Sequence, residues 1–356
     1  MSAFRHFELR AGPTAFARIR EQGFRLDDVD TLLGAAGGPK WLVLSGLDRL
    51  LAPALFAQRA RPLHLIGASI SSWRFACYAQ PDPVAAINAF EHHYIEQQYS
   101  EKPSLAEVDA GVKGVLDAFL KAGGGPAMPL EHPTARLGVL AVRSRGLTRP
   151  EARPLLAAGM VASISANLVA RRGAGLMFRQ TVFHDPRHAA PIEKRRGLPI
   201  DRTPLSAENI HGALMASSSI PGLMSGVDDP PGARRGRYRD GGLVDYHLDL
   251  PVADEGGLVF QPHFFDRVVP GWFDQSIPWR KAKYLDRRVL LYPSADFVQK
   301  LPHGRIPSRK DFSELGNADR IKAWWKVTEA ANALGEEVME AMASGALAQG
   351  VMPFGS

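Results

Sequence analysis

The fold is decided by the stretch LHLIGASISSWRFACYAQ, which covers Leu63 to Gln80. Leu63 to Ile66 is a short apolar run that ends at a glycine, and it predicts a buried strand. Ile70 to Gln80 follows after a sharp turn and predicts a helix. The same order occurs earlier in the chain, because Val29 to Ala36 predicts a strand and Lys40 to Leu51 a helix. Strands that alternate with helices in this way favour an α/β fold with a parallel sheet.

Later patterns continue the alternation of strands and helices. Ser104 and Glu107 form a capping-box pattern ahead of an apolar helical stripe, and a long amphipathic helix is predicted from Asn317. The further predicted elements are a helix at Leu155 to Val169 and strands at Leu137 to Val142, Leu176 to Phe183, Leu258 to Phe260 and Val289 to Tyr292. No fixed repeat, low-complexity tract or long linker divides the chain, so we predict a single domain across residues 1–356.

The composition is that of a folded protein. Hydrophobic residues make up 45% of the 356 residues and charged residues 22%, which is close to globular averages and excludes a disordered chain. Cys77 is the only cysteine, so no intrachain disulfide can form, and we expect this residue to be buried. The sequence shows no signal-peptide core and no apolar run of membrane-spanning length, which predicts a soluble, cytoplasmic protein.

The turn GASIS, Gly67 to Ser71, lies in the strand, turn and helix context of a nucleophile elbow. Gly67 lets the chain turn tightly without a Cβ clash. The helix that starts at Ser69 directs free amide groups at negative charge that develops there. Taken alone, the motif is better explained by an N-cap serine, which needs no catalytic role.

A second motif, GAAGGPKW at Gly34 to Trp41, ends the first predicted strand and opens a helix. Glycine-rich turns of this kind point backbone N–H groups at an anion, which is either a phosphate or the oxyanion of a tetrahedral intermediate. The two interpretations fit equally. The spacing does not match the GxGxxG of dinucleotide sites, and Lys40 is not followed by the Ser or Thr of a P-loop. Nucleotide binding of either kind is therefore disfavoured.

The third motif is RYRDGG, Arg237 to Gly242. An isolated Asp-Gly pair usually marks a tight hairpin turn, because both residues tolerate positive φ angles. This interpretation of Asp240 is weakened by the two motifs before it and by a further stretch, ALMASSSIPGL at Ala213 to Leu223. The four stretches in this order are informative, although each motif alone is not.

In this order the stretches resemble the patatin-like phospholipase family, whose members have a glycine-rich oxyanion block, a Gly-x-Ser-x-Gly elbow, an Ala-Ser-x-x-x-Pro helix end and a late Asp-Gly-Gly or Asp-Gly-Ala. The resemblance covers core motifs across residues 31–251. It implies a three-layer α/β/α sandwich with a mainly parallel central sheet, on which residues 252–356 pack as a helical C-terminal extension.

The resemblance also implies the roles of individual residues. Ser69 matches the nucleophile and Asp240 the base of a Ser-Asp dyad, while Gly37 and Gly38 match the glycines of the oxyanion hole. The supporting positions that the resemblance implies are Lys40, Gly67, Gly241 and Gly242. No metal or other cofactor is implied.

Two positions depart from the family pattern. Ser71 stands where the family usually has glycine, and serine is small enough to be tolerated there. Trp41 also replaces a glycine, and its indole puts the shape of the oxyanion region and the acyl entrance in question.

The expected function is that of a lipid acyl-hydrolase, phospholipase A-like or esterase, which acts on phospholipid or another acyl ester through an acyl-Ser69 intermediate. One alternative is an acyltransferase or transacylase with the same dyad. Another is a catalytically inactive lipid-binding protein, which the two departures keep open.

Histidines offer a rival catalytic arrangement, the Ser-Asp-His triad of ordinary α/β-hydrolases. His247, His263 and His303 all follow Asp240 in the chain. Eleven histidines in this length make some downstream histidine almost inevitable, so the dyad is preferred. The adjacent pair His92 and His93 lacks the i, i+4 spacing of helical metal ligands, and we predict no metal site.

Basic clusters suggest contact with an anionic membrane surface. They lie at Lys194 to Arg196, around Arg234 to Arg239 and between Arg280 and Arg288, the last after a stretch that contains Phe264, Phe265, Trp272 and Phe273. Aromatic residues beside cations are typical of lipid-headgroup interfaces. A protein core with solvated arginines explains the same pattern equally well. The net charge of +6 by itself is better explained by a solvated, arginine-rich surface. No nucleic-acid partner is predicted.

Overall fold

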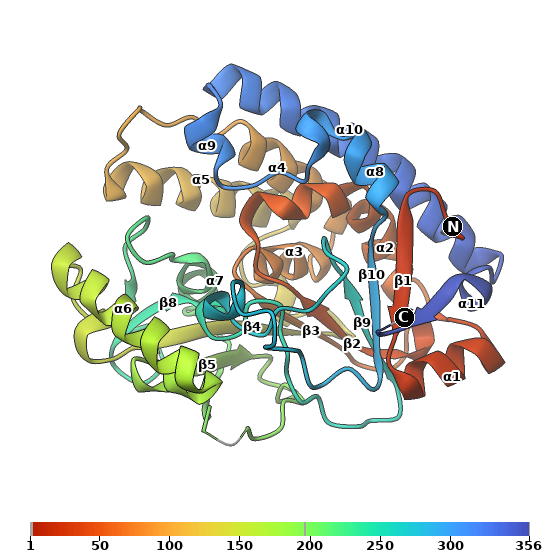
Figure 1. Ribbon diagram of the computed structural model, residues 1–356, viewed down its shortest axis with the longest axis horizontal. Helices are drawn as coiled ribbons and strands as arrows, with labels where there is room; N and C mark the ends of the chain where they lie inside the picture. The colour runs from red at the N-terminus through yellow and green to blue at the C-terminus, as the bar shows by residue number, and fades with distance from the viewer. Residues whose placement is uncertain (1–2, 196, 356) are drawn as a thin grey trace.

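Helices cover a mixed, mostly parallel β-sheet in the computed structural model, which describes residues 3–195 and 197–355 (Figure 1). The strands are β1 (Phe7–Ala11), β2 (Val29–Gly34), β3 (Leu63–Ala68), β4 (Ala135–Ser144), β5 (Phe178–His184), β6 (Ile200–Pro204), β7 (Val227–Asp228), β8 (Arg237–Asp240), β9 (Leu258–Pro262), β10 (Arg288–Pro293) and β11 (Val351–Pro353). The α/β class predicted from the sequence is confirmed.

The sheet follows the order β11-β1-β10-β9-β2-β3-β4-β5-β6, and β8 also pairs with β4. Its centre, from β10 through β9, β2 and β3 to β4, is parallel. Antiparallel pairs join β1 to β10 and both β5 and β8 to β4. β2 and β3 are buried along their whole length, as expected for strands covered on both faces.

The helices are α1 (Pro13–Gln22), α2 (Ser45–Phe56), α3 (Ile70–Tyr78), α4 (Pro83–Ile95), α5 (Leu105–Gly123), α6 (Arg153–Val169), α7 (Ile210–Ser218), α8 (Ala295–Lys300), α9 (Asp311–Glu314), α10 (Asn317–Ala343) and α11 (Leu347–Gly350). Ser104 caps α5 by accepting a hydrogen bond from the Glu107 amide at 3.1 Å. The Glu107 carboxylate binds the amide and hydroxyl of Ser100 instead of the Ser104 amide, so only the serine half of the predicted capping box forms. None of these helices is both long and apolar enough to cross a membrane.

The long helix predicted from Asn317 is α10, which runs along α2 (Figure 1). A Cβ on Gly46 of α2 would lie 2.2 Å from the carbonyl oxygen of Ala331, so glycine permits this close approach. Residues 252–356, expected as an extension packed on the core, also supply β9, β10 and β11 to the central sheet.

The segment predicted as one helix from Lys40 to Leu51 is divided. A 3₁₀ helix covers Gly38–Leu44, and α2 begins only at Ser45. Gly38 has a positive φ of 56°, and the next residue, Pro39, has no amide N–H to donate. The chain therefore enters the helix through a tight turn that places Gly37 and Gly38 beside the end of β2.

Candidate active site

Ser69 occupies the turn between β3 and α3, as the elbow motif predicted. Its φ of 55° and ψ of −131° place a non-glycine residue in a sparsely populated conformation, and such strain is common at nucleophiles held on sharp turns. The backbone on both sides is fixed. The Ser69 amide donates to Ser217 Oγ at 2.8 Å, and the Ser69 carbonyl accepts from Ser72 Oγ at 2.6 Å.

Asp240 reaches Ser69 through the order of the sheet. β3 pairs with β4, and Ala141 of β4 lies opposite Asp240 at the end of β8. Ser69 Oγ donates a hydrogen bond to Asp240 Oδ2 at 2.7 Å, and the Gly242 amide donates to Oδ1 at 2.7 Å. The two predicted members of the dyad are therefore in direct contact across 171 positions of sequence.

Burial raises the pKa of the Asp240 carboxyl, although the charge of Arg309 and the hydrogen bonds from Ser69 and Gly242 oppose this rise. Ser69 is also almost fully buried, with 3% of its surface exposed. A carboxylate that is poorly solvated is a stronger base than one in water. The environment of Asp240 thus favours its taking a proton from Ser69.

Gly37 and Gly38 follow β2 at the start of the 3₁₀ helix. No described residue accepts a hydrogen bond from either amide in the structure, and Gly38 lines the same cavity as Ser69. A Cβ on Gly37 would lie 2.5 Å from the Phe264 ring, so this position has room only for glycine. Amides that are free beside a nucleophile are suited to hold an oxyanion.

Lys40 lies behind these glycines and does not line the cavity. Its Nζ is 3.5 Å from the Gly37 carbonyl oxygen and 5.9 Å from the ring centres of Phe264 and Phe265. Burial, reinforced by the charge of Arg309, lowers the pKa of Lys40 to about 8. Below that pKa the protonated amine places positive charge beside the Gly37 carbonyl oxygen.

Ser71, the first departure from the family pattern, is accommodated by Gly34. A Cβ on Gly34 would lie 2.4 Å from the Ser71 Cβ, so the serine fits because the facing residue has no side chain. Ser71 Oγ donates to the Ala68 carbonyl at 2.8 Å and accepts from the Ala68 amide at 3.0 Å. The extra hydroxyl thus reinforces the turn that carries Ser69.

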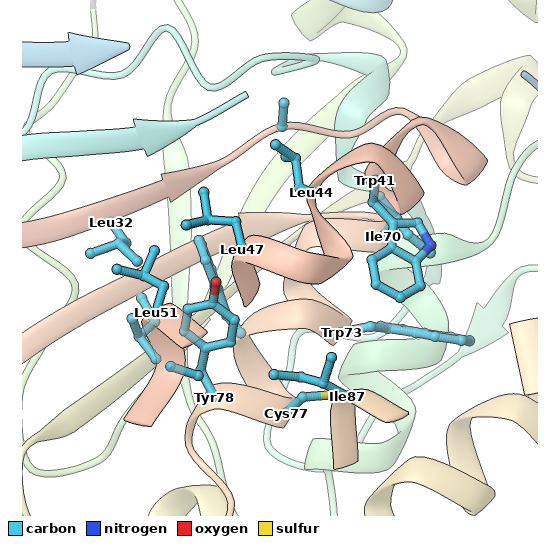
Figure 2. Packing of buried hydrophobic residues seen from close by; sticks show 14 of the residues in the cluster. Leu32, Trp41, Leu44, Leu47, Leu51, Ile70, Trp73, Cys77, Tyr78 and Ile87 are labelled. Carbon is cyan, nitrogen blue, oxygen red and sulfur yellow. The ribbon is translucent and has the colours of Figure 1, made fainter. Parts of the chain in front are cut away.

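Trp41, the second departure, does not narrow the cavity. Its side chain is buried in the cluster that also contains Ile70 and Trp73 (Figure 2), and it stacks on Phe90 with ring centres 4.2 Å apart. It is not one of the cavity-lining residues, although Tyr94, which it contacts edge-on, is one of them. The indole serves the packing between the 3₁₀ helix and α4.

The cavity in front of Ser69 has a volume of about 890 Å³. Most of its wall is apolar or aromatic and comes from α3, α5, α9 and the loop after α7; examples are Trp73, Val108, Val112, Ile220, Met224 and Phe312. A space of this size and character suits a flexible acyl chain.

The downstream histidines do not complete a triad. His247 and His263 are buried and in ring contact with each other at 4.3 Å, and burial lowers the pKa of His263 to about 3. His303 is exposed. None of the three has a hydrogen bond to Ser69 or Asp240 in the described structure. In addition, no group of three or more His, Cys, Asp or Glu among the described residues could hold a metal ion.

The basic clusters contain several side chains that cannot reach a lipid surface. Arg195, Arg239 and Arg288 are buried, as are Phe264 and Phe273. Arg195 pairs with Asp245 at 2.6 Å, and Arg239 with Glu151 at 3.0 Å. These arginines therefore act in the interior, a role that a run of basic residues does not indicate.

Sequence reasoning gave no role to three groups that build the site. Ser217 links the Ser69 amide to the Leu140 carbonyl, to which its Oγ donates at 2.6 Å. Asp48 holds α3 through Arg74, with contacts of 2.6 and 2.7 Å, and Arg309 lines the cavity. Only Ser217 had a sequence signal, since it stands in the Ala-Ser pair of the family motif.

Comparison of the sequence with protein-family models and with curated proteins found no match.

Proposed function

We propose that this protein is a serine acyl-hydrolase of the patatin-like type that cleaves phospholipid or another acyl ester. The observation that carries the proposal is the 2.7 Å hydrogen bond from Ser69 Oγ to Asp240 Oδ2 at the wall of a largely apolar cavity. A nucleophile in hydrogen-bond contact with its base is the basic requirement for covalent acyl transfer. The three-layer sandwich and the C-terminal extension of that family belong to the same proposal, and the packing of α10 on α2 supports them.

The reaction begins when Ser69 Oγ attacks the ester carbonyl carbon and its proton passes to Asp240 Oδ2. The carbonyl oxygen becomes an oxyanion, which the free amides of Gly37 and Gly38 are suited to stabilise, by about 3 kcal/mol for each donor in comparable enzymes. The bond to the alcohol oxygen then breaks, and Asp240 returns the proton to that leaving oxygen. An acyl-Ser69 ester remains.

Water completes the cycle by attacking the acyl carbonyl while Asp240 accepts its proton. Fatty acid leaves and Ser69 regains its hydrogen. An alcohol in the place of water would give the transacylase outcome from the same intermediate.

The experiment that tests the proposal is labelling of the full chain with an alkyl fluorophosphonate, followed by peptide mass spectrometry. We expect a single adduct on Ser69, together with release of free fatty acid from acyl esters. Acyl transfer to added glycerol in place of free acid would indicate the transacylase. An unlabelled Ser69 in a folded protein would contradict the enzyme proposal and leave the lipid-binding alternative.

The pH dependence of kcat/KM is expected to show an acid limb above the ordinary aspartate range. Asp240 acts only when ionised, and burial raises its pKa, so activity should fall about tenfold for each pH unit below that raised pKa. The measurement is kcat/KM against pH for wild type and for His247→Ala and His263→Ala. A shift in the pH at which kcat/KM falls, in either variant, would favour a histidine base.

Contact with an anionic membrane surface, and a cytoplasmic location, remain part of the proposal. Support comes from α6, which exposes several apolar side chains and has no acidic residue that an anionic lipid would repel. The exposed apolar residues are Leu155, Val161, Ile164 and Leu168. Sedimentation with phosphatidylglycerol vesicles tests this contact, and binding that does not depend on the anionic lipid content would argue against it.

A further inference from the structure

Arg309 lies in the segment just before α9 and reaches the catalytic end of the cavity. It lines that cavity together with Ser69 and Gly38. A Cβ on Gly38 would be 3.0 Å from Arg309 Nε and 3.3 Å from its Cγ. The side chain therefore lies across the glycine whose amide is proposed to hold the oxyanion.

The Arg309 guanidinium has no partner among the residues that the structure describes. It makes no hydrogen bond and has no carboxylate oxygen within 4.0 Å, in contrast to Arg74 and Arg195, which are both paired with aspartates. The acids near it in sequence are engaged elsewhere. Asp311 binds Arg305 at 2.7 Å and accepts from Trp324 Nε1 at 2.9 Å.

The other charged groups around this end of the cavity do not pair with Arg309. Glu314 also lines the cavity but is exposed and 3.6 Å from Arg305, and Glu101 is exposed. Lys40 lies close enough to Arg309 for the two charges to act on each other. Asp240 is a buried acid on this side; burial raises its pKa, and the charge of Arg309 opposes that rise. Its carboxylate oxygens, however, take hydrogen bonds from Ser69 and Gly242 and lie beyond 4.0 Å of the guanidinium.

A guanidinium in the cavity wall that is paired with no acid indicates an anionic ligand group. A guanidinium offers a planar fork of donors that fits phosphate with two hydrogen bonds. The apolar walls of the same cavity fit an alkyl or acyl chain. The ligand that satisfies both features is an amphiphile with its phosphate close to the reacting ester.

We propose that Arg309 binds a phosphate group of the substrate and makes the enzyme prefer acyl esters with a phosphate near the ester over neutral ones. This inference rests on the proposed acyl-hydrolase function for its catalytic meaning. It gives the segment after β10 a part in substrate recognition.

Binding is tested without turnover in the Ser69→Ala full chain, by calorimetric titration with decyl phosphate, decanol, decanoate and inorganic phosphate. We expect decyl phosphate to bind most tightly, and Arg309→Gln to weaken it about 10- to 100-fold more than it weakens decanol. Arg309→Lys keeps a cation without the fork and should retain part of the preference. Inorganic phosphate should bind weakly to every variant.

Lys310→Gln is the matched control, because it removes one positive charge from the adjacent residue, which is exposed and does not line the cavity. It should change decyl phosphate affinity less than about twofold. The proposal is overturned if Lys310→Gln has the same effect as Arg309→Gln, if decanol loses as much affinity as decyl phosphate, or if decanoate binds as well as decyl phosphate.

Turnover gives the second measurement, as the ratio of kcat/KM for lysophosphatidic acid to that for monoacylglycerol with the same acyl chain. The ratio should fall about 10- to 100-fold in Arg309→Gln. An unchanged ratio would overturn the role of Arg309 while hydrolysis itself persisted. Phosphate-dependent binding without labelling of Ser69 would instead contradict the hydrolase proposal alone.

Discussion

Replacement of Ser69 by alanine is expected to lower kcat/KM for acyl-ester hydrolysis by about 10⁴-fold or more, the range seen when the nucleophile of a serine hydrolase is removed. Asp240 Oδ2 has the Ser69 hydroxyl as its side-chain donor. The neighbouring hydroxyls of Ser71 and Ser72 donate to backbone carbonyls in the turn. Neither of these two hydroxyls is therefore in a position to replace the nucleophile.

The control for this variant is Ser163→Ala. Ser163 is also buried, but its Oγ donates to the Gly159 carbonyl within α6, away from the dyad. Initial rates with a chromogenic acyl ester, together with circular dichroism to verify folding, give the comparison. Ser163→Ala should keep wild-type turnover, and more than about 1% residual activity in folded Ser69→Ala would place the nucleophile elsewhere.

The parts of the fold that the sequence predicted are those with a local cause. The run that became β3 is apolar and bounded by Gly67, and the helix after it begins where predicted, at Ile70. The long helix from Asn317 repeats its apolar residues with helical period over seven turns and needs no distant partner to be recognised. Elements of this kind carry their own signal.

Pairing between distant strands has no local signal. The contact of Ser69 with Asp240 depends on β4 standing between β3 and β8, and nothing near either residue specifies that order. The resemblance to a family predicted the pair, and the sheet explains it. The short strand β1 was not assigned, although the burial of Phe7–Ala11 alternates along the strand; five residues are a weak signal, and the strand is held between β10 and β11, which come from the other end of the chain.

Side-chain direction and charge pairing were also beyond the sequence. Trp41 follows a glycine-rich turn, and the sequence did not indicate that its indole turns toward Phe90 and away from the cavity. Arg195 looked like part of a surface cluster, yet its partner Asp245 stands 50 positions later. Arg309 has no motif around it, and only the cavity shows that it reaches Ser69 and Gly38.

Replacement of Asp240 by asparagine is expected to lower kcat/KM by about 10³- to 10⁴-fold, as for the acidic member of comparable catalytic sites. The amide has nearly the same shape, and its oxygen can still accept the hydrogen bond that the Gly242 amide now gives to Oδ1 at 2.7 Å. It cannot accept the Ser69 proton. The loss should therefore appear in turnover while the turn stays intact.

The free energy of unfolding is expected to rise or stay the same in Asp240→Asn, although activity falls. Burial raises the pKa of Asp240, so the ionised carboxylate is disfavoured in the folded state, and the stability that this group contributes below its unfolded pKa is lost as pH rises through the folded pKa. Above that folded pKa the wild type carries the penalty in full, and asparagine does not. Urea unfolding should show a variant that is no less stable than wild type within about 1 kcal/mol, with its relative advantage shrinking toward pH 4. A variant that lost several kcal/mol, or one that kept a tenth of wild-type turnover, would show that Asp240 acts in the fold rather than as the base.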